Sequence, residues 1–275
     1  IYSAPDDYGT SYYFRGAVTN NYVKFANKYW RIIRINGDGT IRMIYDGTSA
    51  HANGESSTDR QIGTSAFNFN SSDNAHVGYM YGQRGASNYN ATHANTNNST
   101  IKTAVDNWYK TNIQDAGYSD KVADVIYCND RQIDPSSSGS GYGKSATDYG
   151  ADYRLIDNKS PILMCKDQND RFTVDDTSKG NGALTYPVGL ITADEVAVGG
   201  GVNGYRNSSY YLYTGNYYWT MSPWSFSGSI AGEFGVYSNG NLYPHTVSGT
   251  DGVRPVVSLK SDISVTGSGT QNDPF

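Results

Sequence analysis

The sequence contains no long hydrophobic run and no cluster of positive charge. No window of its 275 residues approaches the roughly 18 to 20 apolar residues that a membrane-spanning helix needs. It carries 21 Lys and Arg against 26 Asp and Glu, for a formal net charge of −5, and the basic residues form no run. Because a nucleic-acid surface needs clustered positive charge, we expect no nucleic-acid partner. Because no apolar run is long enough to span a bilayer, we also expect no direct membrane insertion.

Cysteine is also scarce. The two cysteines, Cys128 and Cys165, are an even pair that one disulfide would use. The alternative is two buried free thiols, and two cysteines are too few to establish an oxidising compartment. Of these alternatives, we expect the disulfide.

Recognisable catalytic and metal-binding patterns are missing as well. The four histidines, at positions 51, 76, 93 and 245, have no metal-ligand spacing to one another or to the cysteines. No G-x-S-x-G nucleophile motif occurs, and no histidine stands near Cys128 to activate it. The stretch from Asn36 begins like a calcium loop, but Gly47 stands where an EF-hand needs glutamate. We therefore expect no enzymatic activity, no metal site and no cofactor, and leave open a structural calcium ion in an Asp- and Asn-rich loop.

Tyrosine, in contrast, is abundant, with 25 of 275 residues. The hydrophobic fraction is only 37%, but tyrosine rings supply large surfaces for burial and a polar tip, so we expect one elaborated domain with an aromatic core. Few charges together with much Tyr, Ser, Asn and Gly are typical of antibody combining surfaces, which use rigid aromatic contacts and adaptable hydrogen bonds. This composition favours a binding protein that works outside the cell.

Alternation and turn residues predict an N-terminal hairpin over residues 22–46. Aromatic and β-branched residues predict strands at 22–25, 29–35 and 40–45, which short turns connect. The polar stretch 46–98 contains scattered aromatic residues, so we interpret it as long loops that pack against the domain.

Capping signals predict two helices. Ser99 is a good N-cap, and apolar residues at i, i+3, i+4 and i+7 predict a helix from there to about Asn112. Thr192 and Glu195 have capping-box spacing, which predicts a short second helix that ends at 199–201.

The segment 217–257 combines an apolar scaffold with a row of polar and aromatic residues. Residues 238–241 predict a hairpin turn, and the β-branched run 253–259 predicts a buried strand. The positions expected to face the core are Ala231, Phe234, Val236, Leu242 and Val247. The residues between them are predicted to form a displayed surface, and the alternative is an ordinary solvated hairpin surface.

Three motifs in this order and spacing carry a resemblance to a known family: GLITADEVA at 189–197, YWTMSP at 218–223 and GVRPVV at 252–257. They resemble the C-type-lectin-like fold of the formylglycine-generating-enzyme type, as used by variable proteins of diversity-generating retroelements. The chain is also similar to repeated surface ectodomains of Gram-positive gut bacteria. The resemblance implies an α+β, C-type-lectin-like fold with paired terminal strands, two helices and long loops, in a single domain over 1–265. We expect the Gly- and Ser-rich residues 266–275 to be a linker to a following domain.

The same resemblance implies a ligand-binding face within the segment 217–257. The residues that it assigns to this face are Trp224, Ser225, Ser227, Ile230, Glu233, Tyr237, Asn241, Tyr243, His245, Ser248, Thr250 and Asp251. The enzymes of this fold use cysteines late in the domain, whereas this chain has none after Cys165. Sugar-binding C-type lectins carry Trp-Asn-Asp, whereas Trp219 is followed here by Thr-Met. We therefore expect neither of these two activities.

Composition and resemblance together predict an extracellular ligand-binding module, an adhesin or receptor-binding domain at a cell surface or a phage tail tip. Its partner would be a protein or glycan ligand on another cell or phage host, and Trp224, Tyr237 and Tyr243 would be the aromatic anchors. The alternative is a structural spacer domain of a bacterial surface stalk or pilus that binds no ligand. An enzyme that uses a carboxylate or a loop metal is a third interpretation, for which the sequence offers no site.

Overall fold

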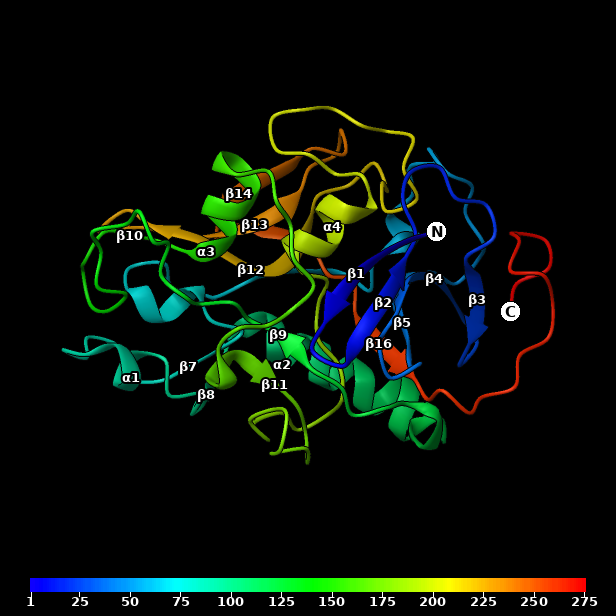
Figure 1. Ribbon diagram of the computed structural model, residues 1–275, viewed down its shortest axis with the longest axis horizontal. Coiled ribbons are helices and arrows are strands. Elements are labelled where there is room, and N and C mark those ends of the chain that lie inside the picture. Colours follow the sequence, from blue (N-terminus) through cyan, green and yellow to red (C-terminus); the bar gives the residue numbers. More distant parts are fainter.

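Two six-stranded sheets form the frame of the protein, which the computed structural model describes over residues 1–275 (Figure 1). The first sheet has the strand order β1-β2-β4-β5-β16, β3 also pairs with β4, and every pair is antiparallel. Its strands are β1 (Tyr2–Asp6), β2 (Gly9–Tyr13), β3 (Tyr22–Phe25), β4 (Lys28–Ile35), β5 (Ile41–Gly47) and β16 (Val256–Leu259).

The second sheet contains most of the C-terminal segment. Its order is β14-β13-β12-β15-β6, with β10 also paired to β12. Its strands are β6 (Thr64–Ala66), β10 (Thr147–Asp148), β12 (Tyr218–Phe226), β13 (Ala231–Val236), β14 (Leu242–Thr246) and β15 (Thr250–Gly252). Two small ladders complete the β-structure, between β7 (Met80–Tyr81) and β8 (Asn97–Asn98) and between β9 (Tyr127–Cys128) and β11 (Arg171–Phe172).

The helices are few and short. They are α1 (Tyr89–Thr92), α2 (Thr100–Tyr109), α3 (Gly150–Asp152) and α4 (Ala193–Gly199). In Figure 1 the first sheet occupies the right half of the view and the second sheet the upper left, with α4 between them and α2 below. No helix combines the length and the apolar character that crossing a bilayer requires.

This sheet-dominated architecture with few helices is α+β, as predicted from the sequence. The prediction that the two terminal strands pair with each other was wrong. Both β1 and β16 belong to the first sheet, but they lie at opposite ends of its strand order. The partner of β16 is β5, where Val256 lies opposite Ile44.

The predicted N-terminal hairpin is confirmed. Ala26 and Asn27, with φ angles of 52° and 55°, form the tight turn between β3 and β4, and positive φ at both positions matches the right-handed twist of the strands. The turn after Ile35 joins β4 to β5, where Asn36 donates its backbone N–H to the Thr40 carbonyl.

Both predicted helix starts are also confirmed. The Ser99 hydroxyl accepts a hydrogen bond from the Lys102 backbone N–H and begins α2, which continues as a π-helical turn to Gln114. Thr192 and Glu195 form a complete capping box at the start of α4, which ends at Gly199. The structure adds the short helices α1 and α3, so the predicted number of two helices is too low.

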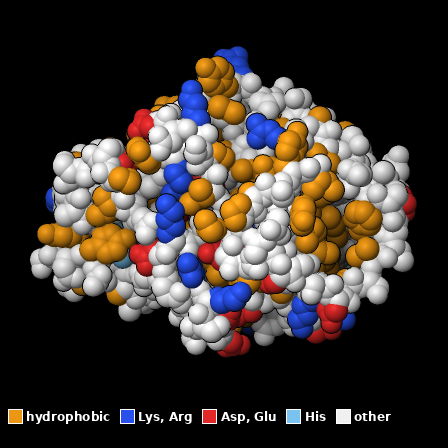
Figure 2. Space-filling view, viewed as in Figure 1, with side chains coloured by type: hydrophobic (Ala, Val, Ile, Leu, Met, Phe, Trp, Pro, Cys, Tyr) orange, Lys and Arg blue, Asp and Glu red, His pale blue; other side chains and the backbone are white.

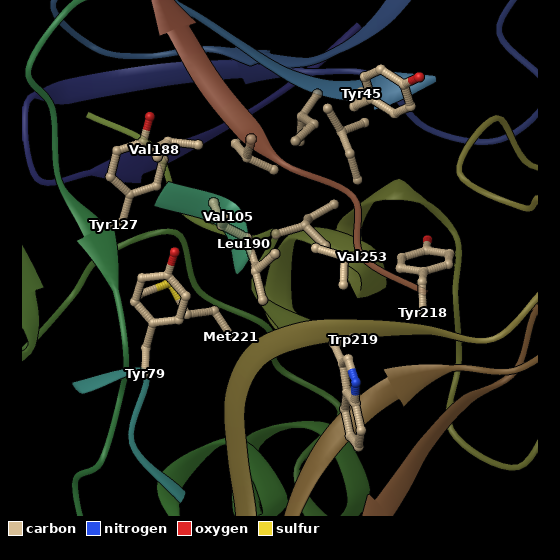
Figure 3. Packing of buried hydrophobic residues seen from close by; sticks show 14 of the residues in the cluster. Tyr45, Tyr79, Val105, Tyr127, Val188, Leu190, Tyr218, Trp219, Met221 and Val253 are labelled. Atoms are coloured by element: carbon tan, nitrogen blue, oxygen red, sulfur yellow. The ribbon is translucent and has the colours of Figure 1, made fainter. Parts of the chain in front are cut away.

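The core between the sheets is rich in aromatic residues, as expected. Figure 3 shows Leu190, Val253 and Met221 close together, with Tyr79 and Tyr127 at one side, and all five side chains are fully or almost fully buried. Burying tyrosine places a large ring in the core but requires solvation or pairing of its hydroxyl. The hydroxyl of Tyr127 donates to the Pro187 carbonyl at 3.0 Å, whereas that of Tyr79 has no partner within the chain.

Two buried carboxylates each contact two buried arginines, and a third, Asp6, pairs with Arg34 at 2.7 Å. Asp46 on β5 accepts hydrogen bonds from Arg60 at 2.9 Å and from Arg254 at 2.8 Å. Glu195 lies 2.9 Å from Nε of Arg34 and 2.5 Å from Nε of Arg42. Main-chain carbonyls also accept hydrogen bonds from Arg42, Arg60 and Arg254; Arg254, for example, donates to the carbonyls of Tyr45 and Leu212.

Cys128 and Cys165 form a disulfide, and no cysteine is free. Cys128 belongs to β9, and Cys165 lies shortly before β11, the partner strand of β9. The disulfide therefore links the two ends of the segment between these strands, in addition to the hydrogen bonds of the strand pair.

Residues 266–275 fold back onto the domain, which corrects the prediction of a linker. The backbone N–H of Tyr22 donates to the Gly269 carbonyl, Lys24 donates to Phe275, and Phe275 donates to Tyr22, at 2.8 to 3.0 Å. Phe275 and Val265 also line an apolar cavity of about 230 Å³ against the first sheet. In Figure 2 hydrophobic side chains gather on the right of the view, the side where Figure 1 places β3 and the C-terminus. Composition indicated a flexible segment, but hydrogen bonds to β3 and partial burial of the Phe275 ring hold it in place.

Candidate functional site

Three tyrosines meet at one end of the second sheet, and we call them the tyrosine face: Tyr217, Tyr237 and Tyr243. The ring centroids of Tyr217 and Tyr237 lie 4.4 Å apart, and those of Tyr237 and Tyr243 lie 4.6 Å apart. Tyr217 is 42% exposed and Tyr243 is 43% exposed, while Tyr237 is half-buried between them. Such aromatic pairs gain stability beyond the area they bury, so the three rings hold one another in place while they face solvent.

The register of the sheet explains this grouping. Trp219 on β12 lies opposite Gly235 on β13, and Gly235 lies opposite Tyr243 on β14. Directly opposed residues point to the same face of a sheet, as do residues two positions apart on one strand. Tyr217 and Tyr237, two positions from Trp219 and Gly235, therefore lie toward the same side. Because Tyr217 comes before the motif that carries the family resemblance, the sequence reasoning missed it.

His245 extends the face along β14. Its ring stacks on Trp219 with a centroid distance of 5.4 Å and an interplanar angle of 18°. Its Nδ1 lies 2.6 Å from a carboxylate oxygen of Asp251, which is buried on β15. His245 is thus oriented by two partners and partly exposed, whereas Asp251 positions it and is not itself displayed.

A loop that the sequence reasoning did not include lies beside the turn that follows β13. In the loop 202–207, the Gly204 N–H donates to the Asn241 side chain at 2.8 Å and the Asn207 N–H donates to the Asn239 carbonyl at 3.1 Å. These bonds hold Tyr205, which is 66% exposed, beside the turn between β13 and β14. No sequence signal predicts this, because a pairing of two polar loops leaves no periodic pattern.

A second group of predicted residues lies at the other end of β13. Ser227 and Ile230 are exposed in the turn between β12 and β13, and this turn lies roughly 17 Å from the turn after β13, given six residues of strand. The Trp224 indole donates to Asp152 at 2.7 Å, and burial raises the pKa of Asp152 to about 6. Ser225 is buried. These residues do not join the tyrosine face.

Ser248 and Thr250 are exposed in the segment that leads from β14 to β15. This segment passes close to His245, because a Cβ added at Gly249 would lie 2.5 Å from the imidazole ring. The two hydroxyls therefore lie near the tyrosine face, as its polar surroundings. Asn241 is half-buried, and its side chain supports the neighbouring loop.

Glu233 was predicted to be displayed, and the structure corrects this. It is fully buried, neither carboxylate oxygen has a hydrogen-bond partner within the chain, and burial raises its pKa well above the usual range. The face of the sheet on which Glu233 lies is covered there by the 3₁₀ turn 74–77, which packs on β12 and β13. The sequence pattern correctly placed Glu233 opposite Phe234, but it could not reveal the second layer.

Replacing Glu233 with Gln is expected to stabilise the protein at pH 8, because the unfolded state gains free energy by releasing the proton of Glu233 and the glutamine removes that gain. The folded state holds a proton that the unfolded state releases above about pH 4, so the stability of the wild type falls as pH rises. The glutamine does not titrate, and the difference between the two proteins should therefore shrink toward pH 4. Urea unfolding at pH 4, 6 and 8 measures it.

Asp262→Asn is the matched control, since Asp262 is exposed. Its stability should follow that of the wild type at every pH. A gain from Glu233→Gln that is equal at pH 4 and pH 8 would contradict the buried, protonated state of Glu233.

One loop has the side-chain order of a hydrolytic triad but not its chemistry. Ser49 Oγ lies 3.4 Å from Nε2 of His51, and Nδ1 of His51 lies 2.7 Å from Glu55. Asp59, however, lies 2.9 Å from the same Nε2 and also accepts from Ser49. A histidine whose ring nitrogens both face carboxylates has no free base for the serine hydroxyl. The arrangement closes the loop 47–60.

No group of three or more His, Cys, Asp or Glu side chains in the structure has an arrangement that could hold a metal ion. The tyrosine face offers rings, hydroxyls, amides and one imidazole, which suit non-covalent recognition.

Comparison with known proteins adds no evidence about this site. The chain matches no protein-family model, no curated protein and no solved structure.

Proposed function

We propose that this chain is an extracellular binding module on a C-type-lectin-like scaffold, and that the tyrosine face is its ligand-binding site. The observation that carries the proposal is the mutual contact of Tyr217, Tyr237 and Tyr243 on a hydrogen-bonded sheet, with the outer two rings more than 40% exposed. Exposed aromatic side chains that are already held in one position lose little conformational entropy on binding. They are the residues that usually dominate binding energy.

The surroundings of the three rings fit the same role. Hydroxyls and amides near the rings come from Ser248, Thr250 and Asn241, and His245 adds one titratable donor or acceptor. Exposed charged side chains are absent from this set, since Asp251 is buried against His245. A protein or glycan ligand presented by another cell or phage host is the class of partner that such a surface recognises.

The scaffold part of the proposal has its own support. The capping box at Thr192, the strand that contains YWTMSP and the buried strand after Arg254 are all formed, and these are the motifs that carry the family resemblance. The disulfide is consistent with an oxidising environment outside the cytosol.

Replacing Tyr217, Tyr237 and Tyr243 together with Ala is expected to weaken ligand binding by at least about 100-fold, because aromatic anchors contribute most of the affinity of such faces. The melting temperature should fall only slightly, since two of the rings are more than 40% exposed. Binding is measured on a printed glycan array and on monolayers of intestinal epithelial cells.

The matched control replaces two tyrosines of the first sheet, Tyr2 and Tyr12, which are 55% and 51% exposed. This variant should bind like the wild type. Equal binding by the triple variant would exclude the tyrosine face, and Trp224→Ala with Ile230→Ala would then test the other end of β13. Absence of binding by the wild type to both probes would favour a structural spacer domain.

A further inference from the structure

A cavity of about 310 Å³ lies behind β14, and it is distinct from the tyrosine face. It is lined from distant parts of the chain, by Arg15, Leu155, Lys159, Ala197, Val202 and Leu242 among others. Figure 1 shows α4 and β14, two elements that line it, close together in the upper part of the view. Leu242 and Tyr243 are neighbours on one strand, so their side chains point to opposite faces of the sheet. Ligands at the two sites would not compete for the same surface.

The charged side chains that line this cavity are positive, whereas the net charge of the whole chain is negative. Arg15 and Lys159 line it, and no Asp or Glu does, although the formal net charge of the chain is −5. Neither cation forms an ion pair in the structure. Asp194, one turn before Ala197 on α4, is already bonded to Arg154. Both side chains are exposed, and because neither has a carboxylate partner, both are available to an anionic ligand.

Arg15 is held in position before any ligand arrives. Its Nη1 donates to the carbonyls of Ala197 and Val198 at 3.2 and 2.9 Å, and the next residue, Gly16, donates its backbone N–H to the Gly199 carbonyl at 2.9 Å. The C-terminal end of α4 thus fixes the guanidinium, and its other N–H groups make no hydrogen bond within the chain. A fixed guanidinium with free N–H groups suits the two oxygens of a carboxylate.

The rest of the lining is suited to an apolar surface. Leu155, Pro161, Ala197, Val202 and Leu242 contribute aliphatic carbon, and Asn203 adds one amide. The volume lies at the lower end of the range for small-molecule sites, roughly 300 to 1,000 Å³. An inorganic anion would leave the aliphatic carbon without a contact, whereas a carboxylate with an apolar face would use both parts of the lining.

We propose that this cavity is a binding site for a small organic carboxylate with an apolar face, with Arg15 and Lys159 binding the carboxylate and the aliphatic residues of α4, β14 and the loop before Pro161 binding the body of the molecule. The proposal is independent of the ligand of the tyrosine face.

The test is titration calorimetry of the whole chain with benzoate, phenylacetate and galacturonate, each beside its neutral counterpart, benzyl alcohol, 2-phenylethanol and galactose. At least one carboxylate should bind with a dissociation constant of about 1 mM or lower, and its counterpart should bind at least about tenfold more weakly. Inorganic phosphate should bind no better than the counterparts. Equal binding of acid and counterpart, equal binding of phosphate, or no binding of any of the three acids would overturn the proposal.

Variants test the residues. Lys159→Glu should raise the dissociation constant roughly tenfold or more, and Val202→Phe, which fills the cavity, should do the same for an acid with a ring. Lys166→Glu is the matched control, because Lys166 is exposed and does not line the cavity. Arg15→Gln is expected to abolish binding. Because Arg15 also bonds to the C-terminal end of α4, the melting temperature of this variant should be compared with that of the wild type, to show that the end of the helix stays folded. If Lys159→Glu and Val202→Phe both leave binding unchanged, the carboxylate binds elsewhere and the assignment is wrong.

Discussion

Asp46→Asn is expected to lose about 3 to 5 kcal/mol of unfolding free energy, or to fail to accumulate as folded protein. The substitution keeps the shape of the side chain but removes the only negative charge bonded to Arg60 and Arg254. All three side chains are at most 1% exposed, so water cannot replace the lost charge. Burial alone already lowers the pKa of Arg254, which shows the cost of holding this cation in the interior. Urea unfolding followed by tryptophan fluorescence measures the loss.

The matched control is Asp115→Asn. Asp115 pairs with Lys110 at 2.7 Å, but both side chains are about half exposed, so this change should cost less than about 1 kcal/mol. Adding Arg60→Met to Asp46→Asn removes one of the stranded cations and should recover part of the loss. A loss below 1 kcal/mol from Asp46→Asn would mean that the two arginines are solvated or neutralised in another way.

Glu195→Gln is the second change with a large expected effect, about 3 kcal/mol at pH 7. Burial acts to raise the pKa of Glu195, but Arg42 and Arg34 outweigh it and hold the pKa at about 2, below the value of about 4.3 for glutamate in an unfolded chain. The stability that this ionisation contributes is therefore present above about pH 5 and is lost as pH falls toward 2. The same carboxylate accepts the Thr192 N–H at the start of α4, so the substitution also weakens the capping box.

Comparing the two proteins from pH 7 to pH 3 isolates this carboxylate from the other acids. The wild type should lose about half of its advantage over Glu195→Gln across that range, with most of the change below pH 5. Asp262→Asn serves as the exposed control here too. A constant difference between wild type and Glu195→Gln at all pH values would show that Glu195 is not ionised in the folded protein.

Local chemistry made a large part of the fold predictable. The turn at Ala26–Asn27, the N-cap at Ser99 and the capping box at Thr192 depend on residues within a few positions, and all three formed as predicted. The turn between β13 and β14 also formed at the predicted residues, 238–241, and the Tyr237 N–H donates to the Asn241 carbonyl across it. Signals of this kind are complete within a short window of sequence, so they need no knowledge of the rest of the chain.

The parts that could not be predicted depend on contacts between distant segments. Glu233 is covered by residues near 75, Tyr205 is placed by the loop beside β14, and the terminal residue Phe275 pairs with Tyr22. In each case the sequence near the residue indicates only a polar or exposed segment. The alternation along β13 gave the correct face for Glu233, but alternation cannot state whether that face meets solvent or another layer.

The pairing of β5 with β16 also bears on how the chain is made. Ile44 pairs with Val256, which lies roughly 200 positions later in the sequence. Contacts between residues so far apart in the sequence slow folding. During synthesis from the N-terminus, the β4–β5 hairpin can form early, but one edge of β5 stays open until residues 256–259 have left the ribosome. Arg42 and Asp46 lie on that strand, and charged side chains on an open edge disfavour pairing with another nascent chain. We therefore expect the charged side chains that are buried in the folded core to disfavour aggregation of the incomplete sheet before β16 is synthesised.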